Sequence, residues 1–191
     1  TLAISQIHQV LANLLRERVP IRDLEAILEV LGDQAPHTQS VAALTEAARL
    51  RLARALCGRY RDADGVLRVV ALDPALEERL HEAIVREDRP PHLRLSPSLA
   101  EAISEDLSAA VERLAALGSP PVVVCGSAIR PGLKQMTRAA LPRLIVLSDE
   151  EITRDTELEV VAQIGMPTND EDRTEGERFA ASGVAVQSPH A

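Results

Sequence analysis

The sequence predicts an α/β fold with an all-helical first module: a three-helix subdomain, then a four-stranded, partly parallel α/β subdomain, then a disordered tail. A strand–helix–strand pattern over residues 121–152 is the first reason, because such a unit brings two strands together in parallel. Both strands are apolar throughout rather than alternating, so both faces of the sheet are expected to be buried. The third reason is a set of amphipathic helical stripes before residue 62.

Three amphipathic helices are expected in residues 1–62. Apolar residues three and four positions apart form one stripe in residues 3–17 and a second in residues 24–31. A third helix is expected over about residues 39–59. Short links between such helices predict a compact helical module. A core of about sixty residues is marginal alone, so the module is expected to lean on the second half of the chain or on a neighbouring chain.

Residues 65–165 carry the pattern of the α/β subdomain, with four strands and three helices. A strand is expected at Val66–Leu72. Asp73 then offers an N-cap and Pro74 a first helical residue, which together predict the start of a helix. The pair Ser96-Pro97 is a second start of the same kind and precedes a long amphipathic stripe.

The strand–helix–strand unit begins with the apolar run Val122–Cys125 and ends with the run Leu144–Leu147. A last strand, at the edge of the sheet, is expected at Leu158–Ile164. Residues 89–92 are expected to form a rigid loop because they contain two prolines. Residues 166–191 are polar, acidic or small, so they are interpreted as a disordered acidic tail.

Composition argues against nucleic acid as a partner. The net charge is −8, which disfavours binding to a phosphate backbone, and one Tyr, one Phe and no Trp leave no platform for stacking bases. Arginines in and after the third helix offer RNA binding as an alternative, but nearby acidic residues almost balance them. These are Arg49, Arg51, Arg54, Arg59 and Arg61.

No metal or cofactor site is expected, because the five histidines are scattered and no Cys/His cluster has zinc-like spacing. Cys57 and Cys125 lie in apolar patterns and are interpreted as reduced, buried thiols. No apolar run has the length of a membrane span. The chain begins at Thr1 inside a helical pattern, so it is expected to be a piece of a longer protein.

The turn Gly126-Ser127 follows the first strand of the strand–helix–strand unit, where ligands bind in open α/β sheets. One reading is an enzyme or anion-binding site with Cys125 or Ser127 as nucleophile, and another is a response-regulator-like signalling domain. The third reading is a structural turn with Ser127 as a helix N-cap. No phosphate-binding loop, GxGxxG or GxSxG motif is present, which favours the structural turn.

A cluster of charges spans the link between the first two helices, at Arg16, Arg18, Arg22 and Asp23. It is either an ordinary solvated surface, where ion pairs contribute little, or an oligomer contact in which mixed charges fix the register of subunits.

The segment LLRERVPIRDL at residues 14–24 resembles the C-terminal cytoplasmic domain of the export-gate family of type III secretion. This family has a flagellar branch (FlhA) and an injectisome branch (SctV), and both branches stay open here. The resemblance covers about residues 4–165. Three shorter segments agree in the expected order: Leu72-Asp73-Pro74 with Leu76-Glu77, residues 121–125 with Arg130-Pro131, and residues 141–152 followed by a strand that ends with Gln163-Ile164-Gly165.

The resemblance implies a non-catalytic part of an export gate at the cytoplasmic face of the bacterial inner membrane. It implies a multi-span membrane domain before this chain and four cytoplasmic subdomains, of which the chain matches the last two. The helical one would lie at the contacts of a homo-nonameric ring, near Arg16, Arg18, Arg22 and Asp23. Implied partners are other copies of the chain, export chaperone–substrate complexes and components of the secretion ATPase, with no cofactor.

Overall fold

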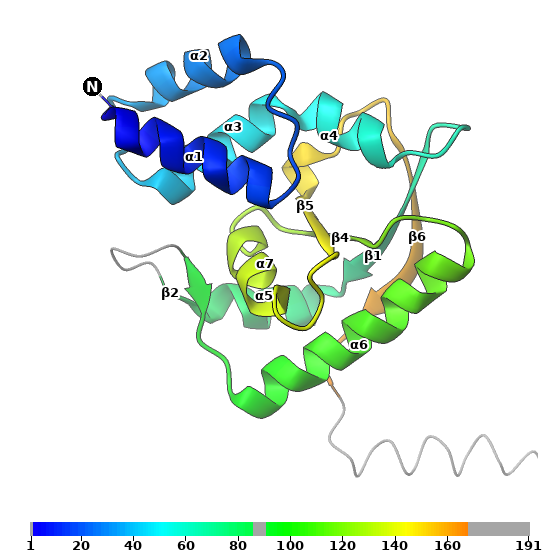
Figure 1. Ribbon diagram of the computed structural model, residues 1–191. Helices are drawn as coiled ribbons and strands as arrows, with labels where there is room; N and C mark the ends of the chain where they lie inside the picture. The colour runs from blue at the N-terminus through cyan, green and yellow to red at the C-terminus, as the bar shows by residue number, and fades with distance from the viewer. Residues whose placement is uncertain (1, 86–90, 168–191) are drawn as a thin grey trace, which may run out of the picture.

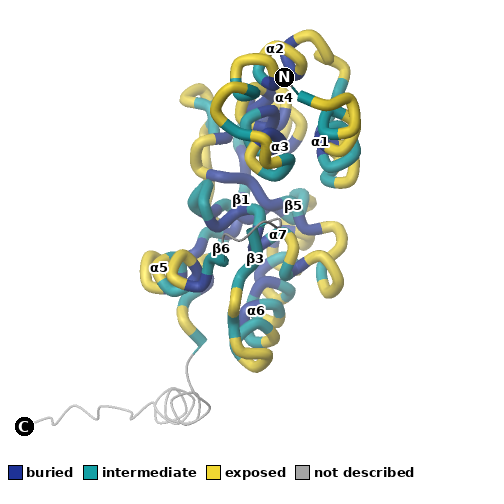
Figure 2. The backbone as a smooth tube through the Cα atoms, turned by 90° about the vertical axis from the view of Figure 1, so that its left-hand side faces the viewer, coloured by how far each residue is buried: buried dark blue, intermediate teal, exposed yellow. Residues whose placement is uncertain are grey.

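The structure is a computed structural model that describes residues 2–85 and 91–167, and it has three layers (Figures 1 and 2). Four helices form the first layer, a parallel β-sheet the second, and three further helices pack on the opposite face of the sheet. We call residues 2–62 the helical half and residues 65–167 the α/β half. The α/β fold with an all-helical first module is confirmed.

The helical half contains four helices rather than the expected three: α1 (Ile4–Arg16), α2 (Leu24–Gln34), α3 (Val41–Arg51) and α4 (Ala53–Tyr60). The single helix expected over residues 39–59 is wrong, because it breaks at Leu52, where ψ is 8°. The two pieces differ in their main neighbours: α3 packs chiefly on α1 and α2, whereas α4 packs on the segment at residues 149–151, which α3 also touches. Leu52 stays buried at the break, so packing rather than a Gly or Pro sets it.

The main sheet has the order β5-β4-β1-β6, and all its neighbours are parallel rather than partly so. The predicted strand–helix–strand unit is present as β4, α7 and β5, and the prediction of an edge position for the last strand is confirmed. The bounds are β1 (Val66–Leu72), β4 (Val122–Cys125), α7 (Arg130–Thr137), β5 (Ile145–Ser148) and β6 (Glu157–Ile164).

Two helices begin where the sequence predicts them. The Asp73 carboxylate accepts a hydrogen bond from the Leu76 amide at 2.7 Å at the start of α5 (Pro74–Glu82). The Ser96 hydroxyl accepts one from the Leu99 amide at 3.3 Å at the start of α6 (Pro97–Ala116). Each cap satisfies a backbone amide that the helix leaves without a partner.

A short hairpin and a 3₁₀ turn complete the described residues. Strand β2 (Ile84–Val85) pairs antiparallel with β3 (His92–Leu93), so the expected loop over residues 89–92 is wrong at His92, while its residues 89 and 90 lie outside the described residues. The turn η1 (Asp149–Glu151) follows β5. The predicted disordered tail, from residue 168 onward, lies outside the described residues.

Each face of the sheet has its own apolar core. Val70 and Val123 contribute to the core beneath α5, α6 and α7, and Leu67, Val69 and Leu147 to the core beneath the helical half. The helical half therefore leans on the α/β half, which is one of the two outcomes expected for so small a module.

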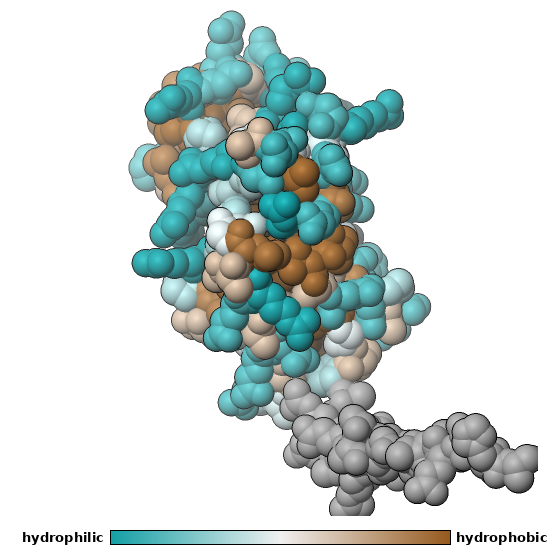
Figure 3. All heavy atoms as spheres, turned by 90° about the vertical axis from the view of Figure 1, so that its right-hand side faces the viewer, coloured by the Kyte–Doolittle hydropathy of each residue, from teal (hydrophilic) through white to brown (hydrophobic). Residues whose placement is uncertain are grey.

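The helical half does not cover the whole sheet. Leu67 on β1 is in register with Leu158 on β6, and Val69 with Val160, so the members of each pair share a face. Leu67 and Val69 are fully buried, whereas Leu158 is 42% and Val160 51% exposed. Figure 3 looks onto the side of the molecule where β6 lies, and hydrophobic side chains gather near its middle.

Candidate functional site

A cluster of charged side chains joins the helical half to the α/β half. The helical half supplies Glu17, just after α1, and Glu46 and Arg49 on α3. The α/β half supplies Arg130, the first residue of α7, and Glu151 in η1. Five charges brought together from such distant parts of the chain form a single ionic network, which we call the charge cluster.

Arg49 lies at the centre of the cluster with 2% of its surface exposed. Its Nε and Nη2 donate to the two oxygens of Glu151, at 2.7 and 3.1 Å, and its Nη1 donates to Glu17 Oε2 at 3.0 Å. Nη2 also donates to the Val146 carbonyl at 3.3 Å. A guanidinium suits this position because its planar donors bind one carboxylate with two parallel bonds and still reach another.

Arg130 is the second buried guanidinium, 1% exposed. It bonds both oxygens of Glu46 and donates from Nη1 to Glu17 Oε2 at 2.8 Å. Burial alone would lower the pKa of Arg130, but the carboxylates of Glu46 and Glu17 outweigh burial and raise it. Arg130 is therefore charged, and Glu17 bridges the two arginines from opposite halves of the protein.

Glu17 makes stability depend on pH. Burial acts to raise the pKa of Glu17, but Arg130 and Arg49 outweigh it, so the pKa lies below its ordinary value of 4.5. Because the pKa is lower in the folded protein, Glu17 stabilises the fold above pH 4.5, and this contribution is lost as the pH falls through the folded pKa.

We expect the free energy of unfolding to fall as the pH is lowered from about 5 to about 3, and Glu17→Gln to make this fall shallower. Urea unfolding followed by circular dichroism over that range measures both slopes. Glu112→Gln, on the exposed side of α6, is the control and is expected to keep the parent slope. Equal slopes for the Glu17 and Glu112 variants would contradict the assignment.

The predicted contact residues flank Glu17 in the chain, but none of them takes part in the ion pairs of the charge cluster. Arg16, Arg18 and Arg22 are all exposed, and Arg16 Nη1 donates to Asn13 Oδ1 at 2.9 Å. Arg18 has a φ of 59°, which turns the chain sharply after α1 and lets its Glu17 neighbour face the cluster. The loop thus exposes three cations and buries the single carboxylate between them.

Asp23 is the N-cap residue of the second helix, α2. Its carboxylate accepts a hydrogen bond from the Ala26 amide at 3.1 Å and caps α2. This carboxylate at a helix N-terminus stabilises α2 through the cap and the helix dipole, whatever else it contacts.

The Gly126-Ser127 turn does not have the geometry of an anion site. The Gly126 amide already donates to Glu77 Oε1 at 2.9 Å, so a carboxylate of the chain takes the place of an external anion. Cys125 is a buried strand residue, as predicted, and burial raises the pKa of its thiol, which disfavours the nucleophilic thiolate.

Ser127 is not the N-cap of α7, and that prediction is wrong. The helix begins at Arg130, and the residue that precedes it, Ile129, makes no side-chain cap. The amides of Ile129 and Arg130 both donate to the Gly126 carbonyl, at 3.0 and 3.1 Å, so Ser127 lies within a turn that leads into the helix.

Sequence reasoning missed the charge cluster, because it considered Arg49 only among arginines that could bind RNA and Arg130 only as part of a segment that resembles the export-gate family. Arg49 is buried, while Arg51 and Arg61 face Glu29 and Asp155 at 3.9 and 3.4 Å, so these arginines do not form one basic face. A signal was present: Arg49 lies on the same helical stripe as Thr45 and Leu52, and a charge on a buried stripe requires a partner.

Within residues 2–85 and 91–167, no group of three or more His, Cys, Asp or Glu side chains is placed to hold a metal ion. The helices of the same residues include none with the length and apolar character of a membrane span.

Relatives of the chain are flagellar proteins. The FHIPEP family matches residues 1–157. Flagellar biosynthesis protein FlhA of Salmonella typhimurium is 36% identical over 162 residues, which are 85% of this chain and 23% of that protein. FlhA of Bacillus subtilis is 28% identical over 163 residues, which are 85% of this chain and 24% of that protein. The chain thus spans about a quarter of the length of these relatives.

Solved structures of injectisome proteins share the fold. Nonameric EPEC SctV-C matches with a TM-score of 0.76 at 29% identity, over 85% of this chain and 49% of that one. The Chlamydia pneumoniae CdsV protein matches with a TM-score of 0.78 at 23% identity, over 85% of this chain and 47% of that one, which is a likeness of fold alone. The chain therefore belongs to the FHIPEP family, the family of the FlhA and SctV proteins.

Proposed function

We propose that this chain is a non-catalytic part of the cytoplasmic ring of a type III secretion export gate, of the flagellar or the injectisome kind. The observation that carries the proposal is the match of 85% of the chain to an SctV-C domain solved as a nonamer. The nonameric cytosolic domain of EscV, with a TM-score of 0.64 at 30% identity over 84% of this chain and 47% of that one, supports the same assembly.

The contacts between the two halves support a role for the loop at residues 16–23. The charge cluster and the core under α1–α4 tie the helical half to the sheet, so both halves move as one body. The loop that carries Arg16, Arg18 and Arg22 is then held at a fixed position, which is what a ring contact with a fixed register requires. We propose that this loop, with Asp23, lies at or near the contact between neighbouring subunits.

The same proposal also implies the binding partners of this chain. Other copies of the chain would bind through the helical half, while export chaperone–substrate complexes and components of the secretion ATPase would dock on the assembled ring. The membrane would be reached only through a part of the protein that precedes these residues, at the cytoplasmic face of the inner membrane.

Arg22→Glu in the full cytoplasmic domain is expected to weaken ring assembly about tenfold or more, because reversing a charge at a subunit contact introduces repulsion. Native mass spectrometry over a concentration series measures the population of the ring. Arg113→Glu, an equally exposed arginine on α6, is the matched control and is expected to assemble like the parent. Unchanged assembly of the Arg22 variant would remove this residue from the contact.

A further inference from the structure

A groove of about 450 Å³ opens beside the charge cluster. Residues of α1, α3 and α7 line it, together with the loop after α7, so both halves of the protein contribute. Pro91, Pro131 and Pro142 form parts of its wall. Proline rings give the groove stiff, partly apolar walls that lose little conformational freedom when something binds.

The cations of this groove outnumber its available carboxylates. Arg16, Lys134 and Arg138 line it, and no ion pair is recorded for them within the described part of the chain. Its two carboxylates, Glu17 and Glu46, are already bound to buried arginines of the charge cluster. The lining as a whole carries four cations (Arg16, Arg130, Lys134 and Arg138) against these two carboxylates, so an excess of two positive charges remains.

Lys134 is the cation of the groove that lies on α7, and it is half-buried. Its ammonium donates a hydrogen bond to the Leu144 carbonyl, a neutral acceptor. Burial lowers the pKa of Lys134, and although Glu17 opposes this, the nearby charges of Arg130 and Arg49 lower it further. Because cations outnumber carboxylates along its lining, the groove is positive in a chain whose net charge is −8, and such a groove favours an acidic ligand.

The geometry of the groove suits carboxylates presented by a peptide. Arg16 lies at the end of α1 and Arg138 just after α7, so guanidinium groups from both halves of the protein line the groove together with Lys134 of α7. Guanidinium groups bind carboxylates through paired hydrogen bonds, and the proline walls can take the aliphatic stems of Glu side chains.

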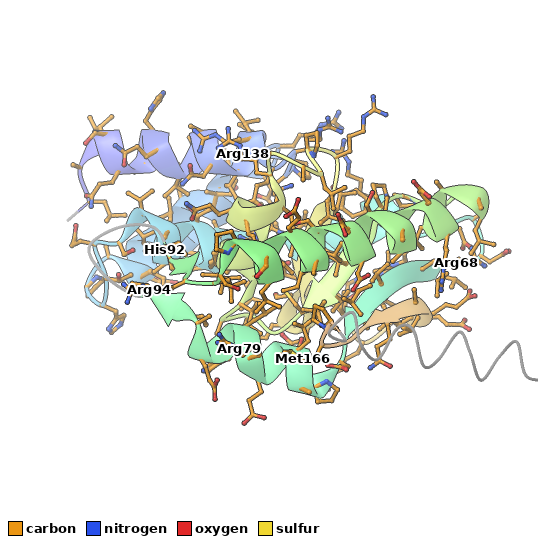
Figure 4. The ribbon with its side chains drawn as sticks, turned by 90° about the horizontal axis from the view of Figure 1, so that it is seen from below. Arg68, Arg79, His92, Arg94, Arg138 and Met166 are labelled. Atoms are coloured by element: carbon orange, nitrogen blue, oxygen red, sulfur yellow. The ribbon has the colours of Figure 1, made fainter. Side chains whose placement is uncertain are left out.

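We propose that this groove, here called the basic groove, binds an acidic segment of a partner protein. Residues 168–191 of the same protomer are also acidic, but Met166, which precedes them, lies on the opposite side of the molecule from Arg138 (Figure 4). A partner's segment is therefore favoured over the chain's own. All the lining residues come from one protomer, but Arg16 is also one of the residues that we propose at the ring contact, so the population of the ring is measured for each variant beside peptide binding.

A labelled peptide of alternating Glu and Asp tests the proposal, with fluorescence anisotropy as the readout and a Gln/Asn peptide of equal length as its control. We expect the acidic peptide to bind in a salt-dependent manner, and Arg16→Ala/Arg138→Ala to weaken binding about tenfold or more. Arg94→Ala/Arg113→Ala removes two exposed arginines elsewhere and keeps the same net charge, so it should bind within about twofold of the parent.

Two results would overturn the proposal. One is equal binding by the two double variants, which would mean that the peptide responds only to net charge. The other comes from deletion of residues 168–191: a gain of about tenfold in peptide affinity would identify the chain's own segment as the occupant. We expect the deleted protein to bind within about twofold of the parent, and circular dichroism to show that every variant is folded.

Discussion

Replacing Arg49 with Met is expected to lower the free energy of unfolding by about 3–5 kcal/mol, because it leaves a buried carboxylate without its counter-charge. Glu151 is 1% exposed and receives two of its hydrogen bonds from Arg49. The methionine fills much of the space of the arginine stem, so the loss in free energy of unfolding comes from removal of the charge rather than from a cavity. Native domains are stable by only about 5–15 kcal/mol, so the variant would be close to unfolding.

Arg51→Met is the matched control. Arg51 lies two residues further along α3, its side chain is 53% exposed, and its distance to Glu29 is 3.9 Å. An exposed ion pair of this kind contributes about 0–1 kcal/mol. Urea unfolding monitored by circular dichroism gives both values, and similar losses for the two arginines would show that the cluster is not a stabilising junction.

A double variant tests whether the instability of Arg49→Met comes from leaving the Glu151 carboxylate without a partner. Arg49→Met/Glu151→Gln removes both charges, and the new amide oxygen can still accept the bond that Glu151 takes from the Ser148 amide at 2.8 Å. We expect the double variant to be more stable than Arg49→Met alone, because a buried pair costs least when both charges are removed together. If the double variant were less stable than Arg49→Met, the instability of Arg49→Met could not be caused by burial of an unpaired Glu151.

Local signals in the sequence predicted the sheet well. The run Val122–Cys125 is too short and too β-branched for a buried helix, and it became β4. Asp73-Pro74 combines an N-cap with a residue that fits only the first helical turn, and α5 begins there. In each case the physical cause lies within a few neighbouring residues, so the sequence alone was sufficient.

Features set by tertiary packing could not be predicted. The break at Leu52 has no local cause, because a continuous helix satisfies the same apolar stripe, and only the different main neighbours of α3 and α4 require it. Arg130 and Glu46 are 84 residues apart along the chain, and nothing in the local sequence pairs them. The prediction for Ser127 was wrong for a related reason: a serine after a strand is often a cap, but the backbone turn at Gly126 moves the N-cap position from residue 127 to Ile129.

Leu67→Ala is expected to lower the free energy of unfolding by about 2–5 kcal/mol, because it leaves a cavity between the sheet and the helical half. Leu67 is fully buried on the central strand β1. Its register partner Leu158 lies on the same face of β6 with 42% of its surface exposed, so Leu158→Ala is a control with the same chemistry on the neighbouring strand. We expect that control to cost less than about 1 kcal/mol, as for substitutions outside a core.

The pair of variants also tests whether the two halves unfold together. Tyr60, the single tyrosine of the chain, is buried at the end of α4 in the core shared with Leu67. Its fluorescence reports the helical half, whereas circular dichroism reports helices of both halves. If the shared core makes one cooperative unit, both signals of the Leu67 variant will shift to the same lower urea midpoint. An earlier transition of Tyr60 alone would mean that the helical half detaches first, and the charge cluster would then not suffice to hold the loop that we propose as a ring contact in place.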